Sequence, residues 1–196
     1  MKNLIFGFVI AAITFTACNG SANHTNSAAS TSLTKDTPTA MQQQPVYHAS
    51  QTFPAKEIIA DYLQLKNALA KDNGKDASTA ANAIVAALAK VDMKTLSGAQ
   101  MKTFMDISDD LKEMAEHIGA NSADIRHQRE HFVMLSKDIS DLIKAFGTGG
   151  QTLYKDFCPM ANNGKGAIWI SELKEIKNPY LGKAMPTCGT VKETIQ

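Results

Sequence analysis

Four stretches of the chain repeat apolar side chains every three or four residues, and this period constrains the fold more than any other feature. The first stretch predicts a helix over 55–72, which Asn73-Gly74 is expected to end. A second helix runs from about 76 to 91 and a third from 97 to 118. The fourth helix, which Ser122 can cap, ends at 146. Short polar loops join them, so we expect an all-α fold, an antiparallel up-down four-helix bundle.

Residues 151–196 lose this helical period and are punctuated by glycine and proline. They predict an irregular C-terminal cap or a small hairpin layer. Only the run Ala167-Ile168-Trp169-Ile170 has strand propensity, and Trp169 is expected to be buried against the bundle. Irregular segments of this length are unusual inside a compact domain, so they indicate a functional region or a covalent or metal staple.

The first eighteen residues have the form of an export signal. Lys2 precedes an apolar run over 4–12, which is too short to span a membrane, and small residues precede Cys18. A small residue before a lone cysteine resembles the bacterial lipobox, although Phe15 departs from its usual aliphatic residue. We expect removal of 1–17 and acylation of Cys18, which would anchor the protein to a membrane of the cell envelope. An ordinary secreted protein with a spare cysteine is the alternative.

The mature chain is expected to consist of a disordered tether over 18–52 and one domain over 53–196, because the tether has few large apolar residues. Without residues 1–17 the chain has 19 basic and 19 acidic residues. This balance argues against nucleic acid as a partner. Neither a P-loop nor a serine hydrolase or zinc protease motif is present, so we do not expect an enzyme.

Two cysteine-methionine clusters could hold a soft metal ion. They are Phe157-Cys158-Pro159-Met160 and Met185-Pro186-Thr187-Cys188. Thiolate and thioether donors suit Cu(I) because both the donors and the ion are large and polarisable. Export also places Cys158 and Cys188 in an oxidising compartment, where a disulfide needs only these two residues and leaves the methionines as core filler. The two alternatives stay equal here, and they could be two redox states of one site.

The chain resembles the DUF3347 family over about residues 55–196. The residues that carry the resemblance are Gln128-Arg129-Glu130-His131-Phe132, Cys158-Pro159-Met160, Gly166-Ala167-Ile168-Trp169, Asn178-Pro179-Tyr180, Met185 and Cys188-Gly189. The family is found in Bacteroidetes lipoproteins and as an appendage of heavy-metal efflux adaptor proteins. The resemblance therefore implies metal handling beside efflux-system proteins, and it carries over no catalytic residue.

Histidines on the third and fourth helices give a weaker metal signal. His127 and His131 are four residues apart and share a helix face, but no third ligand is adjacent in the sequence. His131 belongs to the family-like string and is the better supplementary ligand. His117 lies near a helix end, where a cation interacts favourably with the helix dipole, and we expect only that role.

The sequence thus predicts an exported, lipid-anchored helical domain that binds Cu(I) or another soft metal ion and passes it to an efflux partner. The expected ligands are Cys158, Met160, Met185 and Cys188, with His131 as a fifth. The alternatives are a structural or interaction module pinned by a Cys158–Cys188 disulfide, and an exported inhibitor or stress protein that binds another protein through its cap.

Overall fold

The computed structural model describes residues 55–196. The predicted signal peptide, Cys18 and the tether lie outside the described residues. The elements are α1 (Ala55–Ala70), α2 (Gly74–Leu88), η1 (Met93–Thr95), α3 (Gly98–Ala120), α4 (Ile125–Phe146), β1 (Leu153–Cys158), β2 (Ala167–Ser171), η2 (Gly182–Ala184) and β3 (Thr190–Ile195).

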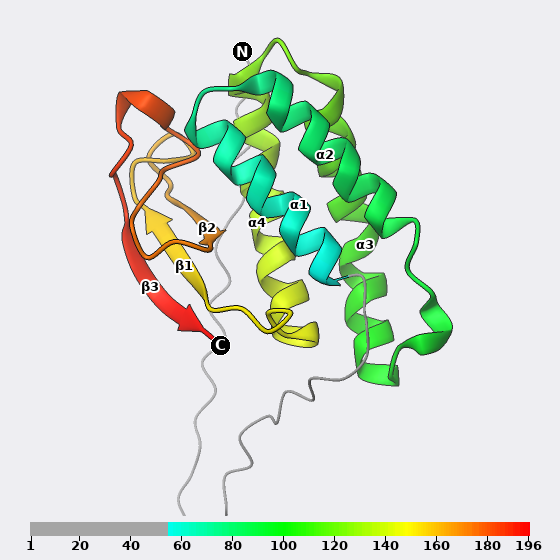
Figure 1. Cartoon of the computed structure of the whole chain (residues 1–196). Helices are drawn as coiled ribbons and strands as arrows, with labels where there is room; N and C mark the ends of the chain where they lie inside the picture. The colour runs from blue at the N-terminus through cyan, green and yellow to red at the C-terminus, as the bar shows by residue number, and fades with distance from the viewer. Residues whose placement is uncertain (1–54) are drawn as a thin grey trace, which may run out of the picture. The chain divides into compact units, whose positions relative to one another are not determined.

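The four predicted helices are confirmed, and successive helices run in opposite directions (Figure 1). Each helix packs against the next, and α1 also contacts α4. The apolar stripes of the helices meet in one core, whose fully buried members include Ile58, Leu69, Ile84, Leu111 and Leu135. Within the described residues, no helix has the length and apolar content that crossing a membrane requires.

Two helix boundaries differ from the predicted ones because of capping side chains. Asn73 does not simply end the first helix: its Oδ1 accepts a hydrogen bond from the Asp76 amide at 3.0 Å and starts α2 at Gly74. Likewise Asp124, and not Ser122, caps α4 by accepting from the His127 amide at 3.0 Å.

The all-α prediction holds only up to residue 146, because the C-terminal cap contains a three-stranded antiparallel sheet in the order β2-β1-β3. The strand-like run over 167–170 is β2, and Trp169 is fully buried as expected. β1 contains polar Lys155 and Asp156 beside a bulge against β3, so its pattern does not alternate regularly. The side chains of β3 are exposed except for partly buried Ile195, so this strand has no apolar face to recognise.

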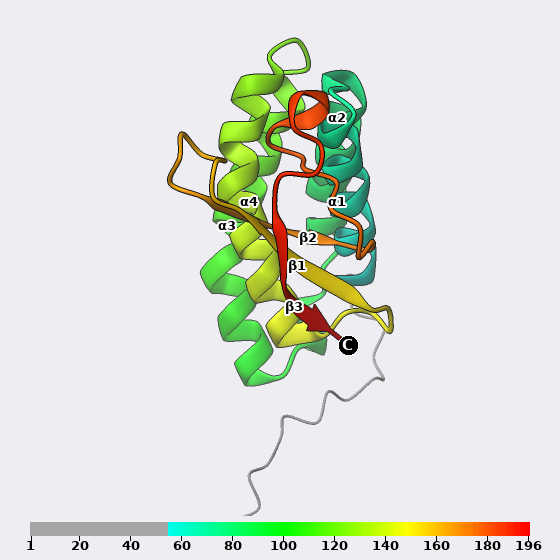
Figure 2. The same ribbon diagram turned by 90° about the vertical axis from the view of Figure 1, so that its left-hand side faces the viewer.

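The sheet lies on one side of the bundle, with β2 against α4 and α1 and β3 farthest from the helices (Figures 1 and 2). Buried tyrosines join the two layers. The Tyr62 hydroxyl accepts from the Ile170 amide at 3.0 Å and bonds with Ser136 Oγ at 2.9 Å. The Tyr180 hydroxyl donates to the Ile168 carbonyl at 2.5 Å. The sheet is therefore attached by hydrogen bonds as well as by apolar packing.

Two ionisable side chains are buried between the layers. Lys66 donates to Ser171 Oγ at 3.3 Å and to Glu172 Oε2 at 2.8 Å, so its charge is paired. Asp156 is fully buried, and neither carboxylate oxygen has a hydrogen-bond partner in the structure of residues 55–196. Burial raises the pKa of Asp156 to about 7, and the nearby Lys66 cation opposes this rise.

The first turns of α4 are tied to four other segments. Buried Gln128 donates from Nε2 to the carbonyls of Gly74 at 2.9 Å and Ile118 at 3.0 Å, at the adjoining ends of α2 and α3. Arg129 donates to the carbonyl of Leu69 at 2.9 Å and that of Pro179 at 2.8 Å, and it pairs with the Asp72 carboxylate. This turn therefore fixes how the helices and the cap meet.

We expect Gln128→Ala to lower the free energy of unfolding by about 2–4 kcal/mol, because it removes a buried side chain whose amide donates to two carbonyls. The exposed Gln64→Ala is the matched control and should cost less than about 0.5 kcal/mol. Urea unfolding followed by circular dichroism measures both. Equal costs for the two variants would contradict the role given to Gln128.

We expect Asp156→Asn to become increasingly stabilising, relative to the wild type, as pH rises from about 5 to about 8. The folded carboxyl has a pKa of about 7 against about 3.9 when unfolded, so the folded state binds more protons in this window and loses stability as they leave. Asparagine does not titrate. Urea unfolding across this range, with the exposed Asp109→Asn as control, checks the sign.

Candidate metal centre

Three histidines from two helices meet at the α3–α4 hairpin. His117 lies in the last turn of α3, and His127 and His131 are one turn apart on α4. One ligand nitrogen from each histidine can be chosen so that all three lie within 4.8 Å of one another. His131 Nε2 and His127 Nε2 are 3.1 Å apart. Among the described residues this is the group of three or more His, Cys, Asp or Glu whose ligand atoms converge.

The ring arrangement shows what metal binding would require. His117 stacks on His131, with centroids 4.4 Å apart and planes 5° from parallel. His127 meets His131 edge-on, with centroids 4.5 Å apart and an interplanar angle of 77°. A metal ion lies in the plane of each ligating ring, along the nitrogen lone pair. The stacked pair therefore has to rotate about a side-chain torsion before all three nitrogens can bind one ion, and histidine χ2 is a soft torsion.

Other donors surround the cluster. Met114 Sδ is 3.3 Å from His131 Nδ1, whereas His131 Nε2 faces His127. Glu130 Oε2 lies 3.6 Å from His127 Nδ1, and Glu113 Oε1 lies 3.8 Å from His117 Nε2. Carboxylates beside the outer nitrogens of ligating histidines orient the rings and raise their basicity.

The cluster favours neutral imidazole. Burial, followed by the cationic forms of His117 and His127, lowers the pKa of His131 below its usual value, and Glu130 and Glu113 oppose this shift only partly. The neutral ring is the form that binds metal. The neutral His131 ring is therefore available to bind a metal cation.

The distances suit a first-row transition metal. With metal–nitrogen bonds of about 2.0–2.1 Å, two imidazole nitrogens on one tetrahedral ion lie about 3.3 Å apart, close to the 3.1 Å between His127 and His131. Imidazole suits zinc, copper, nickel and iron, and a thioether shifts the preference towards Cu(I). The centre can hold an ion through the three histidines. Met114 faces the other nitrogen of His131, so it is not placed for an ion bound between the Nε2 atoms.

The predicted sulfur ligands lie together only in part. Cys158 Sγ and Cys188 Sγ are 2.7 Å apart, and both thiols are free in the structure. Two thiolates bound to one tetrahedral ion at about 2.3 Å would lie about 3.8 Å apart, whereas a disulfide needs about 2.05 Å. The short separation therefore favours the disulfide. Met160 is 53% exposed and Met185 is 39% exposed, so neither methionine is the core filler expected beside a disulfide.

The sequence interpretation missed His117 as a partner of the two other histidines, and it placed His131 with the cysteines. The structure groups His131 with His117 and His127, and the group contains neither cysteine. One signal could have identified His117. In a tight antiparallel hairpin whose helices end at 120 and begin at 125, residue 117 comes level with the first two turns of the second helix.

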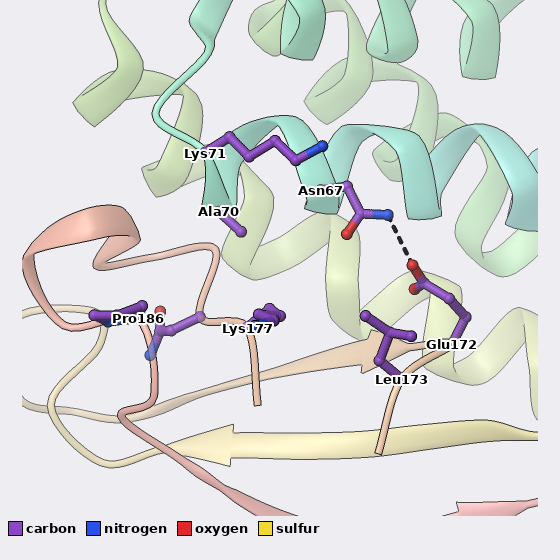
Figure 3. Close-up of a pocket in the computed structure, with 8 residues that line it drawn as sticks. Asn67, Ala70, Lys71, Glu172, Leu173, Lys177 and Pro186 are labelled. Atoms are coloured by element: carbon purple, nitrogen blue, oxygen red, sulfur yellow. Dashed lines mark hydrogen bonds between the residues drawn. The ribbon is translucent and has the colours of Figure 1, made fainter. Parts of the chain in front are cut away.

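A cleft of about 320 Å³ lies between the end of α1 and the segment over 172–186 (Figure 3). Its carboxylate, Glu172, already accepts from Asn67 Nδ2 at 2.8 Å and from buried Lys66 at 2.8 Å. Lys177, also in the lining, pairs with Glu175 at 2.7 Å. Because Glu172 and Lys177 are already paired, the cleft has fewer free polar groups to bind a ligand than the histidine cluster has.

Comparison with known families supports one part of the sequence interpretation. The family model described as "Protein of unknown function (DUF3347)" matches residues 58–151. This match confirms the DUF3347 resemblance over the four helices, which include all three histidines. It ends before β1, so the cysteine-methionine clusters lie outside the matched range. Neither the curated proteins nor the solved structures gave a match.

We expect metal-free wild-type protein to lose stability relative to His131→Gln as pH falls from about 7.5 to about 5. The unfolded histidine titrates near 6.5, whereas the folded one has a lowered pKa, so below 6.5 the unfolded state binds more protons. Glutamine removes this difference. Urea unfolding in the presence of a chelator measures it, with His24→Gln/His48→Gln as control. A difference that does not change with pH would contradict the shift.

Proposed function

We propose that the chain binds a transition-metal ion at His117, His127 and His131, and that it serves metal homeostasis or efflux in the cell envelope. The observation that supports this proposal best is the convergence of three imidazoles from two helices. A histidine that only interacts with a helix dipole needs no partners, whereas His117 stacks at 4.4 Å on His131 although it is exposed. Protonated imidazoles so close together would repel one another, so the arrangement favours the neutral rings that bind a metal ion.

Copper is the ion that we propose. His131 presents Nε2 to His127 and Nδ1 to Met114, so a nitrogen donor and a soft sulfur donor lie on either side of one ring. Imidazole suits both zinc and copper, whereas a thioether adds affinity chiefly for Cu(I), and Met114 can join the same ion once the side chains rearrange around His131. This retains the soft metal expected from the sequence and moves its ligands from the sulfur clusters to the helical hairpin.

The earlier ligand set, Cys158, Met160, Met185 and Cys188, remains a competing proposal for the same metal. The 2.7 Å between the two sulfurs weighs against it, because an ion between them would push the sulfurs apart. A Cu(I) site there would also need thiols kept reduced in the compartment that we propose.

The envelope role rests on the sequence. The signal-like segment and Cys18 support export and lipid anchoring, and the tether over 18–52 would let the domain move above the membrane. The DUF3347 resemblance supports a partner among efflux-system proteins. We propose a binding role without catalysis and without nucleic acid.

The second candidate is a structural or interaction module without metal, in which a Cys158–Cys188 disulfide stabilises the cap. The close approach of the two sulfurs favours this candidate. It predicts that the domain binds no metal ion, so a Cu(I) titration separates the two functions.

We expect metal-free mature protein to bind one Cu(I) per chain in competition with a Cu(I) chelator, and to bind Co(II) with the visible absorption of a low-symmetry imidazole site. Each of His117→Ala, His127→Ala and His131→Ala should weaken binding at least about tenfold, because each removes a ligand. Anaerobic titration measures the Cu(I) affinity.

The matched control is His24→Ala/His48→Ala, which removes the two histidines outside the described residues and should leave affinity unchanged. Cys158→Ser/Cys188→Ser tests the sulfur site. Affinity lost in this variant and kept in the three histidine variants would assign the metal to the cap. An absence of binding in the wild type would favour the interaction module.

A further inference from the structure

The C-terminal strand β3 is weakly held by its own side chains. Thr190 to Thr194 are exposed, and Ile195 is only partly buried. Apart from the backbone ladder to β1, its side-chain contacts are Ile195 against the hydrophobic core, an ion pair of Glu193 with Lys155 at 3.1 Å and Lys192 lying 5.5 Å from the centroid of the Phe157 ring. Exposed ion pairs and cation–π contacts contribute little to stability. The first residues of this edge strand therefore depend mainly on their backbone hydrogen bonds to β1.

The cysteine pair lies where β3 begins. Cys158 is the last residue of β1 and is fully buried, and Cys188 precedes Thr190 by two residues. The register pairs Phe157 with Thr190, so Cys158 and Cys188 are brought together at the end of the ladder. Their sulfurs are 2.7 Å apart.

The backbone holds both cysteines in place. Cys158 is paired with Ala167 in the β1–β2 ladder. Asn178 donates from Nδ2 to the Cys188 carbonyl at 2.6 Å, and the Asn178 amide donates to the Pro186 carbonyl at 2.8 Å. Because both chain segments are fixed independently of the sulfurs, the two thiols are positioned to react with each other.

We propose that Cys158 and Cys188 form a disulfide that holds the start of β3 on β1. The inference is independent of the metal centre, which contains neither residue. The bond would close a loop of thirty residues and so restrict the unfolded chain. It holds the first residues of the strand, whose side chains are exposed.

The bond forms by exchange with an external disulfide. The Cys188 thiolate, which is the more exposed, attacks one sulfur of the external disulfide and releases one thiol. The Cys158 thiolate then attacks Cys188 Sγ, and the second external sulfur leaves as a thiol. The protein pair loses two electrons and two protons, and the external disulfide gains both.

Reduction should release β3 without unfolding the rest of the domain. The Tyr62 and Tyr180 hydrogen bonds that attach the sheet involve neither β3 nor the cysteine sulfurs. The backbone groups of β1 that pair with β3 would then be open to solvent. The amides of residues 190–195 therefore report the redox state of the pair.

The test uses mature chain carrying Cys18→Ser, so that Cys158 and Cys188 are the remaining thiols. One sample is equilibrated with oxidised glutathione and a Cu(I) chelator, and the other with a phosphine reductant. We expect the oxidised sample to resist alkylation without reductant. Hydrogen exchange at 190–195 should be at least about tenfold faster in the reduced sample, while exchange in α4 stays unchanged.

Cys158→Ala/Cys188→Ala should match the reduced sample, and Met160→Leu/Met185→Leu should match the oxidised one. Two thiols that alkylate freely after glutathione treatment would overturn the bond. A bond with equal exchange at β3 in both samples would overturn its role as the attachment. Protection from alkylation that requires added Cu(I) would replace the disulfide with a metal site.

Discussion

Gln128 and Arg129 place the first turns of α4 against four other parts of the chain, and the histidine centre depends on that placement. Gln128 reaches the carbonyls at the facing ends of α2 and α3, and Arg129 reaches the end of α1 and the Pro179 carbonyl of the cap. Buried carbonyls require donors, so a helix carrying these two side chains has one register in which all of them are satisfied. His127 and His131 flank the pair, and the same register brings them beside His117.

The sheet is attached by a second set of polar contacts, and this set explains why the cap is ordered. Tyr62 from α1 and Tyr180 from the cap both bond with Ser136 of α4, at 2.9 Å and 3.4 Å. Trp169 packs edge-on to Tyr180, with ring centroids 6.0 Å apart. The aromatic rings bury apolar area, and the tyrosine hydroxyls form directional hydrogen bonds. Together they fix the position of the sheet on the bundle. The histidine cluster joins α3 and α4, whereas β2 of the sheet contacts α4 and α1.

The helices could be predicted because their apolar period, their capping residues and their packing all indicate the same structure. Ser97 shows this agreement: it forms a complete capping box with Gln100 at the predicted start of α3. The sheet was harder to predict because β1 places Asp156 in the interior and β3 has exposed side chains, so neither strand shows a buried face. The closeness of Cys158 and Cys188 could be predicted, because two cysteines in an oxidising compartment are candidates for a disulfide. The proximity of His117 to His127 and His131 could not be predicted in the same way, because residue spacing along a helix identifies only neighbours on that helix.

The pairing of Cys158 with Cys188 has a topological consequence. Between them lie β2, the Asn178 turn and η2, so a bond makes this part of the cap a covalent ring. The turn over 162–165, which links β1 to β2, is exposed and ends in Lys165. A protease that cuts there opens the ring without dividing the molecule, because the two pieces remain joined through sulfur. The oxidised protein would then tolerate a cut in this exposed turn, whereas the same cut in the reduced protein would leave β2 and β3 on a fragment held only by non-covalent contacts.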